Sequence, residues 1–205
     1  MDRIIEPDDA QLIFSRLLPE LVLASKSENR RALIECGGSI VHQIPTDAEE
    51  FRSGNTPKEV VLNIAKSKME AYLSSDKKIE SLPALTADTM VLFDGELIGK
   101  ASNEGDAKKA IRRFSGKKQI VISASLLYLP RIGIRKIIDT ASVIFKTLSD
   151  KEIDEYIATG DWIEAAGSYR LQRNGWSIVE RIDGDWTTVV GLPMRKLIET
   201  IENSL

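Results

Sequence analysis

The stretch LVLASKSENRRALIECGG, residues 21–38, changes from a short apolar run to the spacing of an amphipathic helix. Leu21–Ala24 predicts a buried strand, and Ser25 with Glu28 forms a capping-box pattern that starts a helix. The glycines at 37 and 38 predict where that helix ends. A strand that leads into a helix presents backbone N–H groups and the positive end of the helix dipole, which together favour an anion.

Side chains at this junction add to its capacity to bind an anion. Ser25 and Ser27 supply hydroxyl groups, and Arg30 supplies a planar guanidinium that suits phosphate oxygens. Neither a GxxxxGK(S/T) nor a GxGxxG motif occurs, so the junction is not a P-loop or a Rossmann fingerprint. Because many helices begin in this way, the pattern alone indicates only a general phosphate site.

Outward from the junction, strands and helices are interleaved along the chain. Apolar and branched runs predict further strands at 39–44, 84–93, 96–99, 119–129, 137–148, 176–182 and 187–191. N-terminal signals predict four more helices, from Thr56 to about Ser74, from Asn103 to Ser115, from Ser149 to near Gly160, and from Pro193 onward. Several strand pairs read as hairpins, so we expect an α/β fold in which helices flank a mixed, twisted sheet. Residues 1–205 are expected to form a single domain of two lobes with a cleft between them.

The composition is that of an ordinary globular protein, with 42% hydrophobic and 29% charged residues. The net charge of −3 argues against broad binding to nucleic acids or anionic membranes. No apolar run approaches the roughly 18–20 residues that span a bilayer. The first residues are acidic where a signal peptide is basic and apolar. We therefore expect a cytoplasmic protein with neither a nucleic acid nor a membrane as partner.

One cysteine, Cys36, and one histidine, His42, narrow the chemistry that the chain can perform. A single cysteine excludes an intrachain disulfide and any CxxC site. A single histidine excludes a histidine-rich metal site and disfavours a Ser-His-Asp triad. An enzymatic activity would therefore depend on carboxylates, lysines, arginines and a hard metal ion.

Two charged residues interrupt apolar patterns. Lys68 falls within the buried stripe expected for the second helix, so its ammonium either reaches water along the surface or enters a cavity that needs it. Asp88 interrupts the apolar run ALTADTMVLF, and a buried carboxylate needs a metal or a cationic partner. A structural ion pair is the alternative to a functional site there. Lys100 lies just after the following hairpin. It is a candidate site residue only because Asp88 precedes that hairpin.

The order and spacing of these pieces resemble the Maf family of nucleoside-triphosphate pyrophosphatases, over nearly the whole chain from Leu21 onward. The family pattern LASxSPRRxxLL appears as LASKSENRRALI, and its acidic DE as Glu49-Glu50. Its LAxxKA appears as IAKSKM with Lys68, its GADTxV as TADTMV with Asp88, and its GKP as GKA with Lys100. Its LSG appears as FSG and its AGxYxIQ as AGSYRLQ, and the closing VVGLP is intact.

The resemblance implies a Maf/ITPase-like fold with a nucleotide-binding cleft between its lobes. It implies hydrolysis of a nucleoside triphosphate between the α- and β-phosphates, which removes unwanted nucleotides from the pool. It also implies a divalent cation, Mg²⁺ or Mn²⁺, and a homodimer. The implicated residues are catalytic Asp88, Lys68 and Lys100, substrate-binding Ser25, Ser27, Arg30 and Gln172, and the metal ligands Glu50, Glu49 and Asp88.

Departures from the family pattern bear on the substrate. Asn29 replaces the first arginine of SPRR, Glu28 replaces its proline, and Ala165 replaces a lysine often found before AGxY. These features, the AGS form and the VERIDG strand resemble the branch that acts on 7-methyl-GTP, which is the substrate we expect. A dTTP/UTP pyrophosphatase is the alternative. A non-catalytic, nucleotide-sensing regulator of septum formation is the alternative of another class, which a loss of Asp88 or the two lysines would have favoured.

Overall fold

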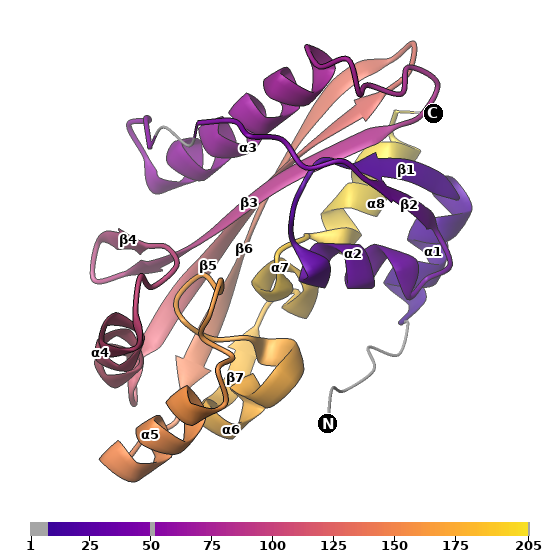
Figure 1. The fold of residues 1–205 in the computed structure, drawn as a ribbon. Helices are drawn as coiled ribbons and strands as arrows, with labels where there is room; N and C mark the ends of the chain where they lie inside the picture. Colours follow the sequence, from indigo (N-terminus) through magenta and orange to yellow (C-terminus); the bar gives the residue numbers. More distant parts are fainter. Residues whose placement is uncertain (1–7, 50–51, 205) are drawn as a thin grey trace. The chain divides into compact units, whose positions relative to one another are not determined.

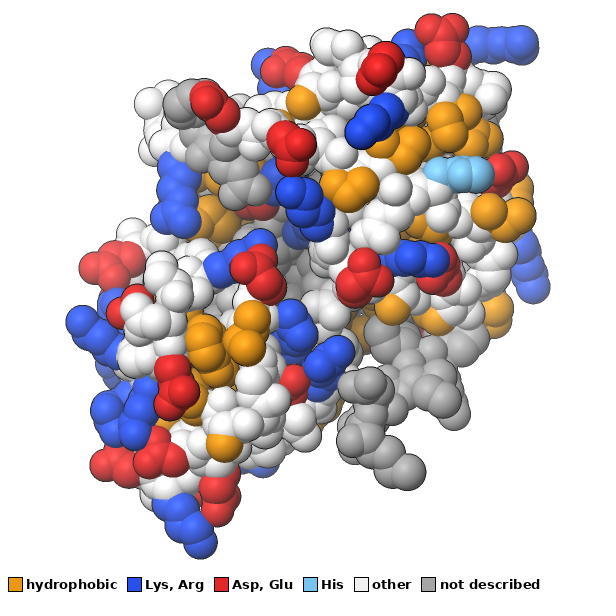
Figure 2. All heavy atoms as spheres, in the orientation of Figure 1, with side chains coloured by type: hydrophobic (Ala, Val, Ile, Leu, Met, Phe, Trp, Pro, Cys, Tyr) orange, Lys and Arg blue, Asp and Glu red, His pale blue; other side chains and the backbone are white. Residues whose placement is uncertain are grey.

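The computed structural model describes residues 8–49 and 52–204, so that Glu50, an expected metal ligand, lies outside the described residues. Strands and helices are interleaved along the described chain (Figure 1). Within those residues, no helix has the length and apolar character needed to cross a membrane. On the face shown in Figure 2, cationic and anionic side chains are interspersed.

The described strands form one seven-stranded sheet: β1 (Glu20–Leu23), β2 (Ile40–Gln43), β3 (Ala84–Phe93), β4 (Glu96–Ile98), β5 (Lys118–Leu129), β6 (Gly133–Phe145) and β7 (Val179–Asp183). Its order is β2-β1-β3-β5-β6-β7, and β4 pairs with β3. β1 is parallel to β2 and β3, whereas the pairs β3–β4 and β6–β7 are antiparallel. The predicted α/β fold with a mixed sheet flanked by helices is confirmed.

Local caps explain where several helices begin. Thr56, Asn103 and Ser149 are the N-caps of α3, α4 and α5, as their sequence patterns predict. The helices are α1 (Asp9–Leu17), α2 (Glu28–Glu35), α3 (Pro57–Leu73), α4 (Glu104–Phe114), α5 (Asp150–Ala158), α6 (Trp176–Ile178), α7 (Trp186–Val190) and α8 (Met194–Glu202), with a π-helical turn η1 (Leu171–Gly175) before α6. α1, which begins with its own capping box at Asp8, has no counterpart in the prediction.

The strand expected at 187–191 is wrong, because the helix α7 occupies this segment. The carboxylate of Asp185 accepts a hydrogen bond from Thr187 N at 2.9 Å, and its carbonyl accepts one from Thr188 N. This local cap outweighs the strand propensity of the branched residues. The strand expected at 176–182 begins late for a related reason, since its first three residues continue the helical path of η1 as α6.

The chain folds into two compact units. The first unit contains Thr89–Ile122 and Thr140–Val190, and the second contains the described residues before Thr89, Ser123–Asp139 and the residues from Gly191 onward. The expectation of a single domain with a cleft between two lobes stays a prediction.

Each unit has apolar packing of its own. In the first, aromatic rings pack against one another at an angle, with the ring centroid of Phe145 5.4 Å from that of Phe114 and 5.2 Å from that of Tyr169. In the second, α3 buries Ala65, Met69 and Tyr72 beside residues of β1, β3 and β5. The α3 stripe predicted from helical spacing therefore faces a core.

Candidate active site

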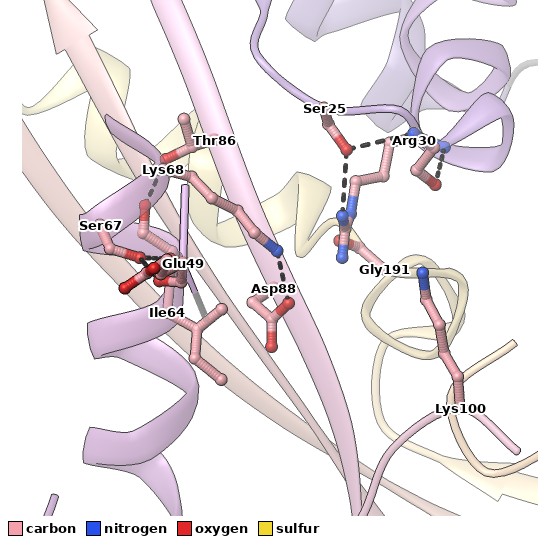
Figure 3. A network of polar contacts seen from close by, with 12 residues as sticks. Ser25, Arg30, Glu49, Ile64, Ser67, Lys68, Thr86, Asp88, Lys100 and Gly191 are labelled. Atoms are coloured by element: carbon pink, nitrogen blue, oxygen red, sulfur yellow. Dashed lines mark hydrogen bonds and ion pairs between the residues drawn. The ribbon is translucent and has the colours of Figure 1, made fainter. Parts of the chain in front are cut away.

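Lys68 on α3 and Asp88 on β3 form a charged pair in the second unit. Lys68 Nζ lies 2.8 Å from Asp88 Oδ1, and the two side chains are only 15% and 13% exposed. Figure 3 shows the two side chains pointing toward one another. The ammonium is therefore not simply directed to water, and the expected cationic partner of Asp88 is confirmed.

A hydrogen bond beside this pair fixes α3 against β3. Thr86 Oγ1 donates to Ala65 O at 2.8 Å, and both residues are fully buried (Figure 3). Residues two apart on a strand share a face, so Thr86 and Asp88 both face α3. Ala65 precedes Lys68 by three residues on the same helix. This hydrogen bond therefore fixes the relative position of α3 and β3, the two elements that carry the ion pair.

An ion pair that is largely removed from water costs desolvation free energy. Buried pairs are often no more stabilising than apolar residues of the same volume, and exposed pairs contribute about 0–1 kcal/mol. Removal of one partner from a fully buried pair, in contrast, costs about 3–5 kcal/mol because it leaves a charge uncompensated. Because apolar side chains could fill the space without that cost, the pair makes this position a candidate for a functional site.

Glu49 belongs to a segment tethered to the same helix. Ser67 Oγ, next to Lys68 on α3, donates to Ile64 O at 2.9 Å and to Glu49 O at 3.4 Å. Glu49 itself is exposed. In the part of the chain that the structure describes, no three His, Cys, Asp or Glu residues are grouped closely enough to hold a metal ion. Glu50 lies outside the described residues, so the expected set of Glu49, Glu50 and Asp88 stays a prediction.

The cap of α2 differs from the expected one. Ser27, not Ser25, is the N-cap, and its hydroxyl accepts from Arg30 N at 3.4 Å. Ser25 Oγ instead accepts from Ser27 N at 3.2 Å, two residues before the helix starts. The predicted capping box of Ser25 with Glu28 is therefore wrong. Both serine hydroxyls accept hydrogen bonds within the junction, and their predicted role toward an anion stays a prediction.

This junction adjoins the strand that carries Asp88. β1 and β3 are parallel neighbours, and Ala24 N donates to Leu85 O at 2.9 Å. Ser25 therefore leaves the carboxyl end of β1 near the stretch of β3 that leads into Asp88. Ligands of α/β proteins commonly bind outside the carboxyl ends of strands, which supports a site at this position.

Arg30 links the junction to the VVGLP segment. Its Nη1 donates to Ser25 Oγ at 3.3 Å, and its Nε donates to Gly191 O at 3.0 Å (Figure 3). Gly191 has a φ of 122°, which is accessible mainly to glycine. Part of the guanidinium thus stabilises the protein itself. The second unit brings together Ser25, Ser27, Arg30, Lys68 and Asp88 among the expected site residues.

Lys100 lies in the first unit, directly after β4. Its backbone forms an isolated β-bridge with Ala166, and its Nζ lies 2.5 Å from Glu164 Oε2. These two charged side chains are 60% and 69% exposed. Because exposed ion pairs contribute little, Lys100 can exchange Glu164 for another anion at small cost.

Gln172, also in the first unit, lies in the π-helical turn η1. Gly175 N closes the turn by donating to Arg170 O at 2.9 Å, and a Cβ at position 175 would lie only 2.6 Å from that oxygen. Within the described residues, the buried Nε2 of Gln172 finds no hydrogen-bond partner. A buried donor left unsatisfied costs about 1–3 kcal/mol, so the amide suits a ligand or a water.

Three residues that support the candidate site are not among those predicted from the sequence. Thr86 holds β3 to α3, and its signal was its place two residues before Asp88 on the same strand face. Gln43 on β2 donates through Nε2 to Ser25 O at 3.0 Å, a bond that no local pattern announces. Asp161 is only 2% exposed, yet between a glycine and a tryptophan it resembles an ordinary turn residue.

The fold and the charged pair define an α/β protein with a candidate site formed by α3, β3 and the β1–α2 junction. A family model described as Maf-like protein matches residues 20–204. The chain therefore belongs to the Maf family.

Three relatives named dTTP/UTP pyrophosphatase match most of the chain. The Thermus thermophilus protein is 35% identical, and the match covers 87% of this chain and 91% of that protein. The Shewanella oneidensis protein is 37% identical, with 88% and 94% covered. The Citrifermentans bemidjiense protein is 36% identical, with 88% and 93% covered. Among solved structures, a nucleoside-triphosphatase / dITP/XTP pyrophosphatase from Mycobacterium abscessus is 13% identical to this chain. The match covers 63% of this chain and 75% of that protein, with a TM-score of 0.36.

Proposed function

We propose that this protein is a nucleoside-triphosphate pyrophosphatase. It hydrolyses the bond between the α- and β-phosphates and yields a nucleoside monophosphate and pyrophosphate. The observation that carries the proposal is the largely buried Lys68–Asp88 pair between α3 and β3, in which Lys68 Nζ lies 2.8 Å from Asp88 Oδ1. The names of the curated relatives support it, since all three describe pyrophosphatases of this kind.

In this proposal Asp88 orients the attacking water and accepts its proton. The water oxygen forms a bond to one phosphorus of the α–β bridge as the bond from that phosphorus to the bridging oxygen breaks. Lys68 holds Asp88 through Oδ1 and adds positive charge near the phosphates. Such reactions depend chiefly on positioning and on neutralising phosphate charge. Ser25, Ser27 and Arg30 contribute donors at the β1–α2 junction.

Two residues of the first unit complete the proposed set. Lys100 exchanges its exposed bond to Glu164 for a phosphate oxygen. Gln172 donates its unpartnered Nε2 to an acceptor of the substrate or of the attacking water. Both residues stand at positions that match the family pattern.

The donor chemistry fits a hard divalent cation, Mg²⁺ or Mn²⁺. Asp88 uses one carboxylate oxygen for Lys68, and the segment of Glu49 is tethered to the residue next to Lys68. Carboxylate oxygens are the ligands that these ions prefer. Asp88, Glu49 and Glu50 would hold the cation, which supplies charge that stabilises phosphate oxygens and eases the loss of a proton from water.

The substrates we propose are dTTP and UTP. The relatives that match favour this alternative over 7-methyl-GTP, because each carries the name dTTP/UTP pyrophosphatase. The departures at Asn29 and Ala165 keep 7-methyl-GTP as a second candidate. We also propose that the protein clears unwanted nucleotides from the pool, forms a homodimer and is located in the cytoplasm.

The test measures pyrophosphate release from dTTP, UTP, 7-methyl-GTP and the ordinary triphosphates, each with Mg²⁺ or Mn²⁺. We expect release from dTTP and UTP at the highest kcat/KM, and none in the presence of a chelator. Binding of a nucleotide with no pyrophosphate release from any of them would contradict the proposal and favour the non-catalytic regulator.

A further inference from the structure

The turn that carries Gln172 is held at both ends by residues of α5 and the loop after it. At its start, Tyr156 Oη accepts a hydrogen bond from Arg170 N at 3.0 Å. Near its end, Asp161 Oδ2 accepts from Asn174 N at 3.0 Å and from Asn174 Nδ2 at 2.8 Å. All of these residues lie in the first unit.

Asp161 directs its carboxylate entirely toward this turn. Its second oxygen, Oδ1, lies 3.6 Å from Arg173 Nη1, so the recorded contacts of both oxygens go to the two residues that follow Gln172. Asp161 is only 2% exposed, whereas Asn174 and Arg173 are exposed. A buried carboxylate is retained only where charge and hydrogen bonds compensate its desolvation. Here the side chain of Arg173 supplies the charge, and Asn174 supplies the hydrogen bonds, that compensate the desolvation of Asp161.

The turn has an irregular backbone, which the bonds from Tyr156 and Asp161 help to hold. Arg173 departs from helical dihedral angles, with φ −110° and ψ −116°. Within the turn, Gly175 N and Arg173 N both donate to Arg170 O, at 2.9 and 3.3 Å. π-helical turns often mark functional sites, and this one presents a buried amide that lacks a partner among the described residues.

We propose that Asp161 is a positioning residue that acts through Gln172. It holds the turn η1 in the one arrangement that presents Gln172 Nε2 as a donor to an oxygen of the nucleotide. The proposal rests on the pyrophosphatase function proposed above. It differs from a purely structural role, in which Asp161 would stabilise the first unit without any special dependence on Gln172.

A double-mutant cycle separates these two roles. Asp161→Asn keeps the volume but presents an amide donor toward the donors of Asn174 and Arg173. We expect it to lower kcat/KM by about 10–100-fold, the scale for a misplaced substrate contact. Gln172→Ala should give a similar loss, and the double variant should be no worse than Gln172→Ala alone. If the two losses multiply, Asp161 does not act through Gln172, and the proposal is wrong.

A reversal of the hydrogen bond provides a rescue. Asn174→Asp in the Asp161→Asn background restores a donor–acceptor pair with the roles exchanged. We expect this swap to recover most of the lost kcat/KM, although each single variant is less active than the wild type. Asp150→Asn is the matched control, since Asp150 pairs with Arg112 on the surface of the same helix region, and its kcat/KM should stay near that of the wild type.

Hydrogen exchange supplies a readout that is independent of catalysis. Asp161→Asn should speed exchange of the amide of residue 174, and the swap should slow it again, while the melting temperature changes little. An active wild type with an equally active Asp161→Asn variant would overturn the positioning role. A wild type that releases no pyrophosphate would instead overturn the proposed function. Hydrogen exchange at residue 174 that is unchanged in Asp161→Asn would show, in either case, that Asp161 does not support the turn.

Discussion

Arg30 joins the β1–α2 junction to a carbonyl that lies 161 positions further along the chain. Its Nε donates to Gly191 O at 3.0 Å, and its Nη1 donates to Ser25 Oγ at 3.3 Å. The rigid guanidinium fork supplies both donors at once, whereas the single ammonium group of lysine cannot reproduce their geometry. Arg30 therefore supports the junction directly, apart from any contact that it makes with phosphate.

Arg30→Lys should weaken both the junction and catalysis although the charge is kept. We expect a loss of about 1 kcal/mol in unfolding free energy, the usual scale of a lost hydrogen bond, and a fall of about 10-fold in kcat/KM. Arg31→Lys is the matched control, because the side chain of Arg31 bonds to Glu35 and Gln43 and not to Ser25 or Gly191. Urea unfolding and steady-state kinetics check both variants. Equal behaviour of the two variants would show that the fork of Arg30 is not needed.

Asp88→Asn should keep the fold and remove most of the activity. The side chains are nearly isosteric, but the amide carries no charge for a cation and accepts a proton poorly. We expect at least a ~100-fold fall in turnover, the scale of losing one electrostatic catalytic group. Asp76→Asn, at an exposed aspartate of the same unit, should have no effect. Activity within a few fold of the wild type, with an unchanged melting temperature, would refute the role of Asp88.

Lys68→Met should lower both stability and activity. Methionine suits the apolar stripe of α3, but it leaves Asp88 without its cationic partner at 13% exposure. We expect a loss of about 1–3 kcal/mol, below the 3–5 kcal/mol of a fully buried pair because some water reaches the site. Denaturant unfolding measures the loss.

The double variant Lys68→Met with Asp88→Asn separates the pair's two roles. Because no charge is then left uncompensated, its stability should return to within about 1 kcal/mol of the wild type. Its pyrophosphate release should remain at background. A stable double variant that still turns over nucleotide would mean that the pair serves the fold alone.

Sequence patterns predict those parts of the fold that depend on neighbouring residues. Thr56, Asn103 and Ser149 each bond to a backbone N–H three residues ahead, so their helices are visible locally. Two serines two positions apart leave the cap of α2 ambiguous, and the structure selects Ser27. The branched run at 187–190 reads as a strand because its cap, Asp185, lies outside it.

The candidate site also combines residues that local sequence patterns reveal with residues that they do not. Lys68 and Asp88 each stand out in an apolar pattern, and Asp88 predicts a cationic partner, but their spacing of 20 residues does not say that they meet. Asp161 gives no sequence signal, because its importance depends on burial and on Asn174, 13 positions later. Side chains that stabilise a site from a distance in sequence are the ones that local reasoning misses.

Ala165→Lys should destabilise the protein rather than supply a useful donor. A lysine often stands at this position in the family, and its replacement is one of the features that resemble the 7-methyl-GTP branch. Ala165, however, is only 5% exposed, so a lysine there must bury its charge or displace its neighbours. We expect a loss of about 2 kcal/mol or more in a thermal or urea denaturation. An unchanged melting temperature would show that the segment opens readily to let the ammonium reach water.

Asn29→Arg is the cleaner test of base preference. Asn29 lies in the first turn of α2, between the cap Ser27 and the anchored Arg30, and it is only partly buried. An arginine there restores the first arginine of the SPRR pattern. Its donors would favour the carbonyl-rich face of thymine or uracil and would repel the positive charge of 7-methylguanine.

We therefore expect the ratio of kcat/KM for dTTP to that for 7-methyl-GTP to rise in Asn29→Arg, by about 10-fold or more. A donor that meets the base directly changes discrimination by roughly 1–3 kcal/mol. Arg31→Lys again serves as the control, because it alters a neighbouring cation without adding one. The measurement is pyrophosphate release with both nucleotides under identical cation concentrations. A ratio that stays constant while both values change would place residue 29 near the phosphates, away from the base, and would leave the preference to other residues.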